Sequence, residues 1–133
     1  MNIRLTQIDG ALPNLALMKL SHWHKSKGDD VYLSRSISRD LFEPEYDKVY
    51  GSAIFTTSMK KIKQFATNFK MPVLGGSFTT EKHHTPEQKN IFNEIKEIAV
   101  VSKLEQTVEE YLGMKKLSLA MRLQPALPTV LSF

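Results

Sequence analysis

Apolar positions recur at two different spacings along the chain, and each spacing predicts a different element. An alternation at every second residue is typical of a strand, and a recurrence every three or four residues is typical of a helix. Pro13 suits the first turn of such a helix, and Gly28 suits a left-handed cap at its end. Up to residue 78 the pattern predicts a strand over 3–8, a helix over 12–27, a strand over 31–34, a loop over 36–45, a strand over 48–55, a helix capped by Ser58 over 59–69 and a strand over 71–74.

The remaining third of the chain begins with a polar linker over 79–85. Thr85, Pro86 and Gln88 then fit the N-cap, the first-turn proline and the capping-box partner of a helix. The apolar face of this helix continues to Ala99, but periodicity does not decide whether 97–102 is helix or strand. Further on, the pattern predicts a helix over 107–113 and a final edge strand over 117–123.

The order of these elements predicts an α/β fold, because parallel neighbouring strands need long right-handed crossovers between them. We expect a doubly wound, mainly parallel sheet of five strands in the order 2-1-3-4-5, with an added C-terminal helical segment. A chain of 133 residues fits a single domain. Its expected parts are a core over 1–78, an inserted linker and helix over 79–106, and a terminal helix, edge strand and tail over 107–133.

One glycine pair, single glycines and polar residues lie near the ends of the predicted strands, where open α/β sheets bind ligands. Two adjacent glycines after a buried strand let a ligand approach the backbone, although such a pair more often only forms a strand-ending turn. We expect an anionic group of the ligand at the helix start near Asn14, where free N–H groups favour negative charge. Beside the carboxylate of Asp9 we expect a ribose hydroxyl or an amide of the ligand. The candidate ligand-binding residues are Asp9, Gly10, Asn14, Gly51, Ser52, Gly75, Gly76 and Ser77.

Composition narrows the classes of function that remain. The chain is 41% hydrophobic and 24% charged, and no apolar stretch is long enough to span a membrane. It has no cysteine, which excludes disulfides, thiolate nucleophiles and cysteine-bound iron–sulfur clusters within these residues. No secretory signal precedes the first strand, so we expect a cytoplasmic protein. The net charge of +4 is compatible with nucleic acid, but the lysines around 60–70 are better explained as a solvated helix face.

No pattern typical of an active site is present, and we expect a non-catalytic chain. Serine-nucleophile and phosphate-loop motifs are absent from the sequence. His22 and His24 are two residues apart on a predicted helix and point to different sides, which favours structural roles over metal binding. His83 and His84 lie in the polar linker without a third ligand at a fixed spacing.

Several segments together resemble a known family. They are Ile3 to Gly10, Leu12 to Leu20, His22 to His24, Glu43 to Asp47, Val49 to Phe55 and the pair Gly75-Gly76. This combination resembles the N-terminal domain of a group of radical S-adenosylmethionine proteins, a domain related to the cobalamin-binding Rossmann-like fold. The resemblance covers about residues 1–78, and 107–113 resembles the short helix that follows the double glycine in the family.

Two departures limit what this resemblance implies. The family's cluster-binding Cys-x-x-x-Cys-x-x-Cys motif is absent, so a catalytic half would lie outside this chain. The Asp-x-His-x-x-Gly loop that coordinates cobalt reads Asp9-Gly-Ala-Leu-Pro-Asn14 here and offers no histidine. The resemblance implies a non-catalytic, cobalamin-binding-like domain with cobalamin or a nucleotide-like ligand, and with a radical S-adenosylmethionine catalytic domain as its partner.

The alternative function is a stand-alone interaction or dimerisation module that keeps the fold without a cofactor. Its surface would lie within residues 80–133, where apolar residues exceed what a sheet edge needs. Packing of the predicted helix that begins at Pro86 against the sheet explains part of these apolar residues. The residues in question are Ile91, Phe92, Ile95, Tyr111 and Leu112.

Overall fold

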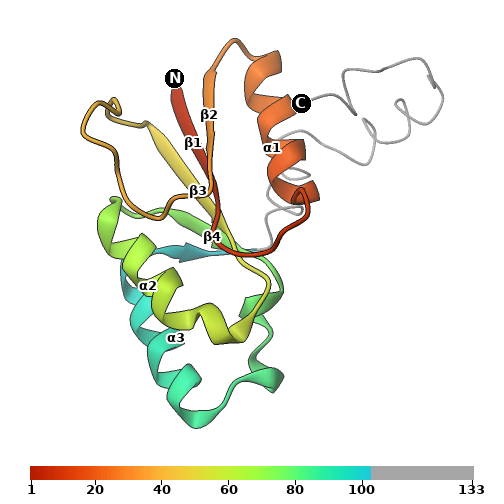
Figure 1. Cartoon of the computed structure of the whole chain (residues 1–133), viewed down its shortest axis with the longest axis vertical. Helices are drawn as coiled ribbons and strands as arrows, with labels where there is room; N and C mark the ends of the chain where they lie inside the picture. Colours follow the sequence, from red (N-terminus) through yellow and green to blue (C-terminus); the bar gives the residue numbers. More distant parts are fainter. Residues whose placement is uncertain (103–133) are drawn as a thin grey trace, which may run out of the picture.

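A sheet of five parallel strands forms the centre of the computed structural model, which describes residues 1–102 (Figure 1). The strands lie in the order β2-β1-β3-β4-β5, and every neighbouring pair is parallel. This arrangement confirms the predicted fold class and strand order. In chain order the strands are β1 (Asn2–Gln7), β2 (Asp30–Ser34), β3 (Lys48–Ser52), β4 (Val73–Gly75) and β5 (Val100–Val101).

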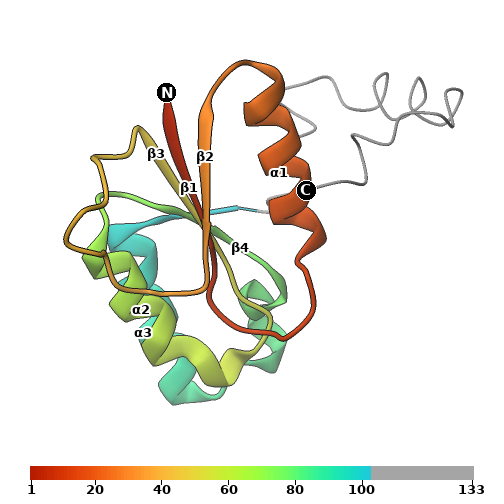
Figure 2. The ribbon, with the colours of Figure 1, turned by 45° about the horizontal axis from the view of Figure 1, so that its top comes forward.

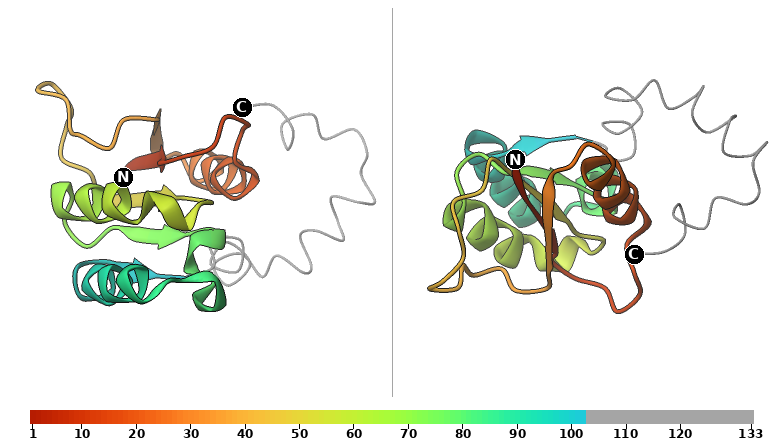
Figure 3. Two further views of the ribbon diagram at one scale, coloured as in Figure 1. Left: turned by 60° about the horizontal axis from the view of Figure 1, so that its bottom comes forward. Right: turned by 90° about the horizontal axis from the view of Figure 1, so that it is seen from above.

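Three α-helices within residues 1–102 cover the two faces of the sheet. They are α1 (Leu15–Ser26), α2 (Met59–Asn68) and α3 (Pro86–Ile98), and the 3₁₀ turns are η1 (Thr56–Ser58), η2 (Ser77–Thr79) and η3 (Glu81–His83). Helix α1 lies on one face, and α2 and α3 lie side by side on the other (Figure 3). The change of face between α1 and α2 places the switch point of the sheet between β1 and β3. None of these helices is long and apolar enough to cross a membrane.

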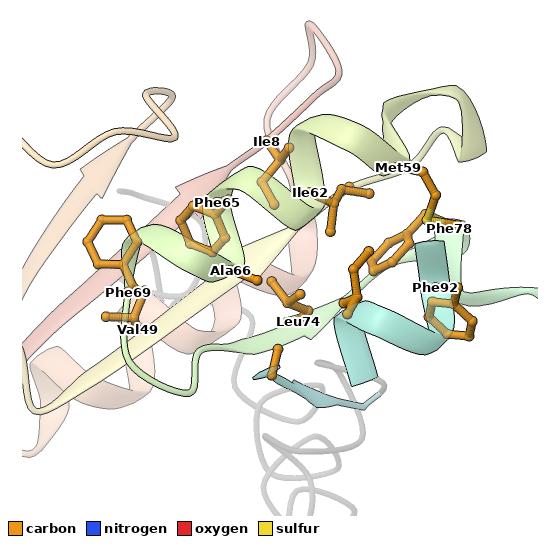
Figure 4. Packing of buried hydrophobic residues seen from close by; sticks show 13 residues of the cluster. Ile8, Val49, Met59, Ile62, Phe65, Ala66, Phe69, Leu74, Phe78 and Phe92 are labelled. Atoms are coloured by element: carbon orange, nitrogen blue, oxygen red, sulfur yellow. The ribbon is translucent and has the colours of Figure 1, made fainter. Parts of the chain in front are cut away.

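Apolar side chains are buried on both faces of the sheet, because successive residues of a strand point to opposite sides. Under α1, Ile3 and Leu5 of β1 pack with Leu17 and Leu20 of the helix and with Tyr50 of β3. A larger cluster fills the space between the sheet and the helices α2 and α3 (Figure 4). Its buried members are Ile8, Val49, Ala53, Met59, Ile62, Phe65, Ala66, Phe69, Leu74, Phe78, Phe92, Ile95 and Ala99.

The two ends of α1 test the predicted start and stop signals. Pro13 precedes the helix instead of lying in its first turn, because Asn14 is the N-cap and has extended backbone geometry. The side-chain oxygen of Asn14 accepts a hydrogen bond from the Leu17 N–H at 3.1 Å. At the other end, Gly28 has a φ of +87°, which confirms the predicted left-handed cap.

The third strand and the second helix also differ from the prediction. Strand β3 ends at Ser52, short of the predicted end at Phe55. The carboxylate of Asp9 accepts hydrogen bonds from the N–H groups of Ile54 and Phe55, and these groups therefore do not extend the ladder. A 3₁₀ turn leads into α2, and the Ser58 side chain makes no capping hydrogen bond.

Helix α3 begins as the sequence predicts. The Thr85 hydroxyl accepts a hydrogen bond from the Gln88 N–H at 3.2 Å, and the Gln88 side chain accepts one from the Thr85 N–H at 3.0 Å. Pro86 is the first residue of the helix. In the fold, α3 is the crossover that joins β4 to β5.

The C-terminal interaction surface expected from the sequence is not formed by α3. Phe92 and Ile95 are buried in the large cluster, and Ile91 packs against that cluster, so the packing alternative accounts for them. Tyr111 and Leu112 lie outside the described residues. The predicted helix over 107–113 and edge strand over 117–123 lie outside them as well.

The ambiguous segment 97–102 contains both kinds of structure. Helix α3 continues to Ile98, and β5 follows at Val100–Val101 beside β4. The fifth strand of the sheet is therefore this short segment. Two residues are too few for periodicity to separate a strand from the end of a helix.

Candidate functional site

The eight predicted ligand-binding residues come together at the carboxyl edge of the sheet, around the segment that follows β3. The Asn14 side-chain amide donates to the Ser52 hydroxyl at 2.7 Å. From the other side, the Ser77 hydroxyl donates to the Ile54 carbonyl at 3.0 Å. The sequence thus places these residues correctly, and their polar groups bond to one another and to the backbone between them.

The carboxylate of Asp9 is used by the chain itself. One oxygen accepts from the Ile54 N–H at 2.6 Å, and the other accepts from the Phe55 N–H at 3.0 Å. Backbone N–H groups of the loop after β3 thus lie where we expected a ribose hydroxyl or an amide of a ligand. This contact fixes the loop that leads from β3 into α2.

Two of the glycines are explained by packing inside the protein. A Cβ on Gly51 would lie 2.6 Å from a ring carbon of Phe65 and 2.8 Å from a methyl group of Leu74. A Cβ on Gly76, whose φ is +116°, would lie 2.0 Å from the carbonyl oxygen of Ala53. Both positions are occupied by protein atoms, so close approach of a ligand is not needed to explain either glycine.

The other two glycines also serve the local backbone. Gly10 has a φ of +87°, and a Cβ there would lie 3.1 Å from the terminal methyl of Ile54. Gly75 ends β4, and its carbonyl accepts the Ala53 N–H at 3.1 Å. A role of these eight residues in ligand binding stays a prediction.

Open space lies next to this cluster, at the carboxyl ends of β1 and β2. We call it the α1 hollow; its volume is about 550 Å³. Of the eight predicted residues only Asn14 lines it. The lining residues are Gln7, Pro13, Asn14, Leu17, Met18, Leu33, Ser34 and Arg35.

The α1 hollow carries positive charge. Among the described residues, Arg35 is the only charged one that lines it. Its guanidinium is held at the rim by hydrogen bonds to the carbonyls of Gly10 (2.9 Å) and Ala11 (3.2 Å). At the start of α1, the N–H groups of Leu15 and Ala16 precede the first intrahelical hydrogen bond and are free to meet an anion.

Sequence analysis missed Arg35, although a usable signal was present. Arg35 directly follows the second predicted strand, and the carboxyl ends of parallel strands meet at one edge. The predicted site rested on glycines near the strand ends, and no glycine directly follows the second predicted strand. A search for charged residues one position after each strand would have found it.

A second hollow of about 540 Å³ lies at the other end of β1 and β2, under the loop that precedes β3. We call it the loop hollow. Arg4 fixes this loop: its guanidinium pairs with the carboxylate of Glu43 and donates to the Ser36 carbonyl at 2.6 Å. It also lies 4.6 Å from the centre of the Phe69 ring. Arg4 is fully buried, so its charge is used inside the protein.

His24 forms a buried hydrogen-bonded chain under α1. Its Nδ1 lies 2.9 Å from Asp29, and its Nε2 lies 3.1 Å from the Tyr50 hydroxyl. Burial lowers the pKa of His24, and the hydrogen bond to Asp29 opposes that shift. The hydrogen bond from His24 lowers the pKa of Asp29 to about 2. The neutral ring therefore donates from Nδ1 to Asp29 and accepts from Tyr50.

His24 thus has a structural role, as the sequence favours. For His83 and His84 the sequence favours a solvated loop, and the structure differs at His84. His84 is buried as well, and its Nε2 donates to the Phe78 carbonyl at 2.6 Å. Within residues 1–102 no group of three His, Asp or Glu side chains is arranged to hold a metal ion.

Comparison with known proteins identifies no relative: the chain matches no family model, and no curated protein matches it.

Proposed function

We propose that this chain is a non-catalytic domain that binds an anionic, nucleotide-like ligand, such as the nucleotide tail of a cobalamin, in the α1 hollow. The observation that carries the proposal is that Arg35 and the start of α1, from Asn14 to Met18, contribute to one hollow. Doubly wound sheets bind ligands at this edge, and helix starts favour anions. The volume of about 550 Å³ is in the range of small-molecule sites.

The non-catalytic part of the proposal is supported by the chemistry of the lining. Ser34 carries the only hydroxyl group in the part of the lining that the structure describes, and its oxygen accepts hydrogen bonds from Arg4 and from the Ser36 N–H. Within residues 1–102 no histidine or carboxylate lines the hollow to act as a base for this hydroxyl. Binding without turnover is the chemistry that this lining supports.

The partner and location follow from the sequence resemblance and from composition. We propose that the domain works beside a radical S-adenosylmethionine catalytic domain that carries the cluster, either joined to it or separate. The absence of cysteine fits a cytoplasmic location.

Calorimetric titration of the full chain tests the ligand. The probes are adenosine diphosphate, inorganic pyrophosphate, hydroxocobalamin and S-adenosylmethionine. We expect at least one of the phosphate-bearing probes to bind, and Arg35→Gln to weaken its binding by about 10- to 100-fold, because a hydrogen bond to a charged group contributes about 1.5–3 kcal/mol.

Arg39→Gln is the matched control for this titration. Arg39 is also an arginine that donates to two backbone carbonyls, those of Glu43 and Pro44, but it lies on the loop before β3. Equal losses in both variants would contradict a site at Arg35. If none of the four probes binds, the ligand function is wrong.

A second candidate function, contact with another protein chain, is favoured by a separate observation. Leu41 and Phe42 are 90% and 94% exposed on the loop that Arg4 and Glu43 hold against the sheet. Two large apolar side chains presented by a fixed loop are typical of an interaction site.

A further inference from the structure

Strand β2 is an edge of the sheet, and one side of its backbone is unpaired within residues 1–102 (Figure 2). The Asp30 N–H donates to the carbonyl of Met1 at 2.9 Å. In a parallel ladder alternate residues bond to the same neighbour, so Tyr32 and Ser34 also face β1. The N–H and C=O groups of Val31 and Leu33 therefore face outward.

Within residues 1–102 this edge carries few of the features that usually prevent pairing with another strand. Natural edges carry charged side chains, especially lysine, or proline, contain a bulge or are covered. The one charged side chain of β2 is that of Asp30, at its first position. The five residues of β2 include no lysine and no proline, and they form a regular ladder with β1. The side chains of Tyr32 and Leu33 are exposed beside the outward-facing backbone groups.

We propose that the β2 edge pairs with the β2 edge of a second copy of this chain. The two strands would run antiparallel about a twofold axis through Tyr32, and the two sheets would join into one continuous sheet. This register uses the whole strand, and it allows Val31 of each copy to exchange two backbone hydrogen bonds with Leu33 of the other.

The side chains of β2 are self-complementary in this register. The Tyr32 side chains of the two copies face each other, and aromatic cross-strand pairs are favourable. On the opposite face of the sheet, Val31 of each copy faces Leu33 of the other, which pairs two apolar side chains. No like charges are placed directly opposite one another.

The charges around β2 also favour a second copy. The acidic residues Asp29 and Asp30 stand at the start of the strand, and Arg35 follows its end. An antiparallel arrangement brings the basic end of each copy to the acidic end of the other. Asp30 makes no side-chain hydrogen bond or ion pair within residues 1–102, so its carboxylate is available for this contact.

The exposed loop residues lie next to the same edge. Leu41 and Phe42 line the loop hollow together with Val31 and Tyr32. Because the loop is fixed by the buried Arg4, its apolar tip keeps its place beside the strand. Pairing at β2 would bring the two loops to the same face of the joined sheet and would cover apolar surface on both.

This proposal identifies the surface and the partner for the second candidate function, contact with another protein chain. It does not depend on ligand binding in the α1 hollow. Light scattering on the full chain at micromolar to millimolar concentration measures the mass. We expect twice the 15.2 kDa of one chain. Leu33→Pro removes an outward donor and no hydrogen bond to β1, and Leu33→Lys adds an edge charge; both should give the single-chain mass.

Val100→Lys is the matched control, because Val100 is 47% exposed on the opposite edge strand and Leu33 is 50% exposed. This variant should remain a dimer. Circular dichroism establishes that each variant is folded. Should Leu33→Pro fail to fold, Leu33→Lys carries the test.

Amide hydrogen exchange gives a second, residue-level readout on the unmodified chain. At high concentration the N–H groups of Val31 and Leu33 should exchange more slowly than at low concentration, while that of Tyr32 should be protected at both. A monomer at every concentration, a dimer that survives both Leu33 variants, an assembly larger than a dimer, or loss of the dimer in Val100→Lys would each overturn the proposal.

Discussion

Gly76 and Gly28 both have positive φ, but their surroundings differ completely. A Cβ at Gly76 would meet the Ala53 carbonyl oxygen at 2.0 Å, whereas a Cβ at Gly28 would meet nothing within 4 Å. We expect Gly28→Ala to cost about 1–2 kcal/mol, the strain of the left-handed conformation alone. Gly76→Ala should cost more than about 4 kcal/mol or prevent folding. Urea denaturation of both variants measures this difference, and equal losses would contradict it.

The chain of His24, Asp29 and Tyr50 makes stability depend on pH. Burial keeps the folded-state pKa of His24 below the ordinary 6.5, so the unfolded chain binds a proton first as the pH falls. Stability should therefore decline below pH 6.5. Asp29, with a pKa of about 2 against 3.8, adds a second loss as the pH falls from 3.8 towards 2. The urea midpoint measured across this range checks both signs.

His24→Gln should remove the decline that begins at pH 6.5, because the titrating ring is gone. His22→Gln is the control on the same helix, since the His22 ring makes no hydrogen bond within residues 1–102. A stability that rises on acidification in the unmodified chain would show that the proposed charge state of His24 is wrong.

These residues also show what sequence reasoning can and cannot reach. The sequence predicts glycines near the carboxyl ends of the strands, and the structure has them there, because turn chemistry is local. The reason that glycine is required there was not predictable. A Cβ on Gly76 would clash with Ala53, and a Cβ on Gly51 would clash with Phe65 and Leu74. Such neighbours are set by the three-dimensional packing and leave no periodic trace in a single sequence.

At the scale of elements, the loop before β3 depends on one buried ion pair. Arg4 is fully buried, and its partner Glu43 is nearly so. Arg4→Met leaves an unpaired carboxylate in the interior and should cost about 3–5 kcal/mol. The double variant Arg4→Met with Glu43→Gln should lose less unfolding free energy than the sum of the two single losses, because both members of the pair are then removed together. Urea denaturation of the four proteins measures the coupling.

Arg39→Met removes an exposed ion pair and is the control for the loss of the buried one. Its partner Glu45 is largely open to solvent, and exposed ion pairs contribute about 0–1 kcal/mol. Strict additivity of the Arg4 and Glu43 changes would contradict an anchoring role for their contact.

The elements themselves were predictable where the sequence pattern was long or capped. Helix α3 followed from its capping box, and the end of α1 followed from Gly28. The errors fall where a distant side chain decides the boundary, as Asp9 does at the end of β3. Strand β5 is too short to have a period of its own.

At the scale of the whole molecule, the two proposals concern adjacent surfaces. The α1 hollow opens at the carboxyl ends of β1 and β2, and the proposed dimer forms along β2. Leu33 belongs to both, since it lines the hollow and faces the free edge. Ligand affinity and oligomeric state are therefore best measured separately on each variant. The strand order, by contrast, was predictable from the crossover lengths together with the apolar character of the third and fourth strands.

The parallel sheet also determines how the chain can fold. Asn2 of β1 pairs with Asp30, and Ile3 pairs with Lys48, so the strand joins segments that are distant in sequence on both of its sides. Within residues 1–102 no two strands are joined by a hairpin, and the entropy of closing a long loop opposes every pairing before a ladder exists. During synthesis on the ribosome, β1 leaves the exit tunnel ahead of β2 and β3. Strand β1, an interior strand of the finished sheet, therefore stays unpaired until both of its neighbours have been synthesised.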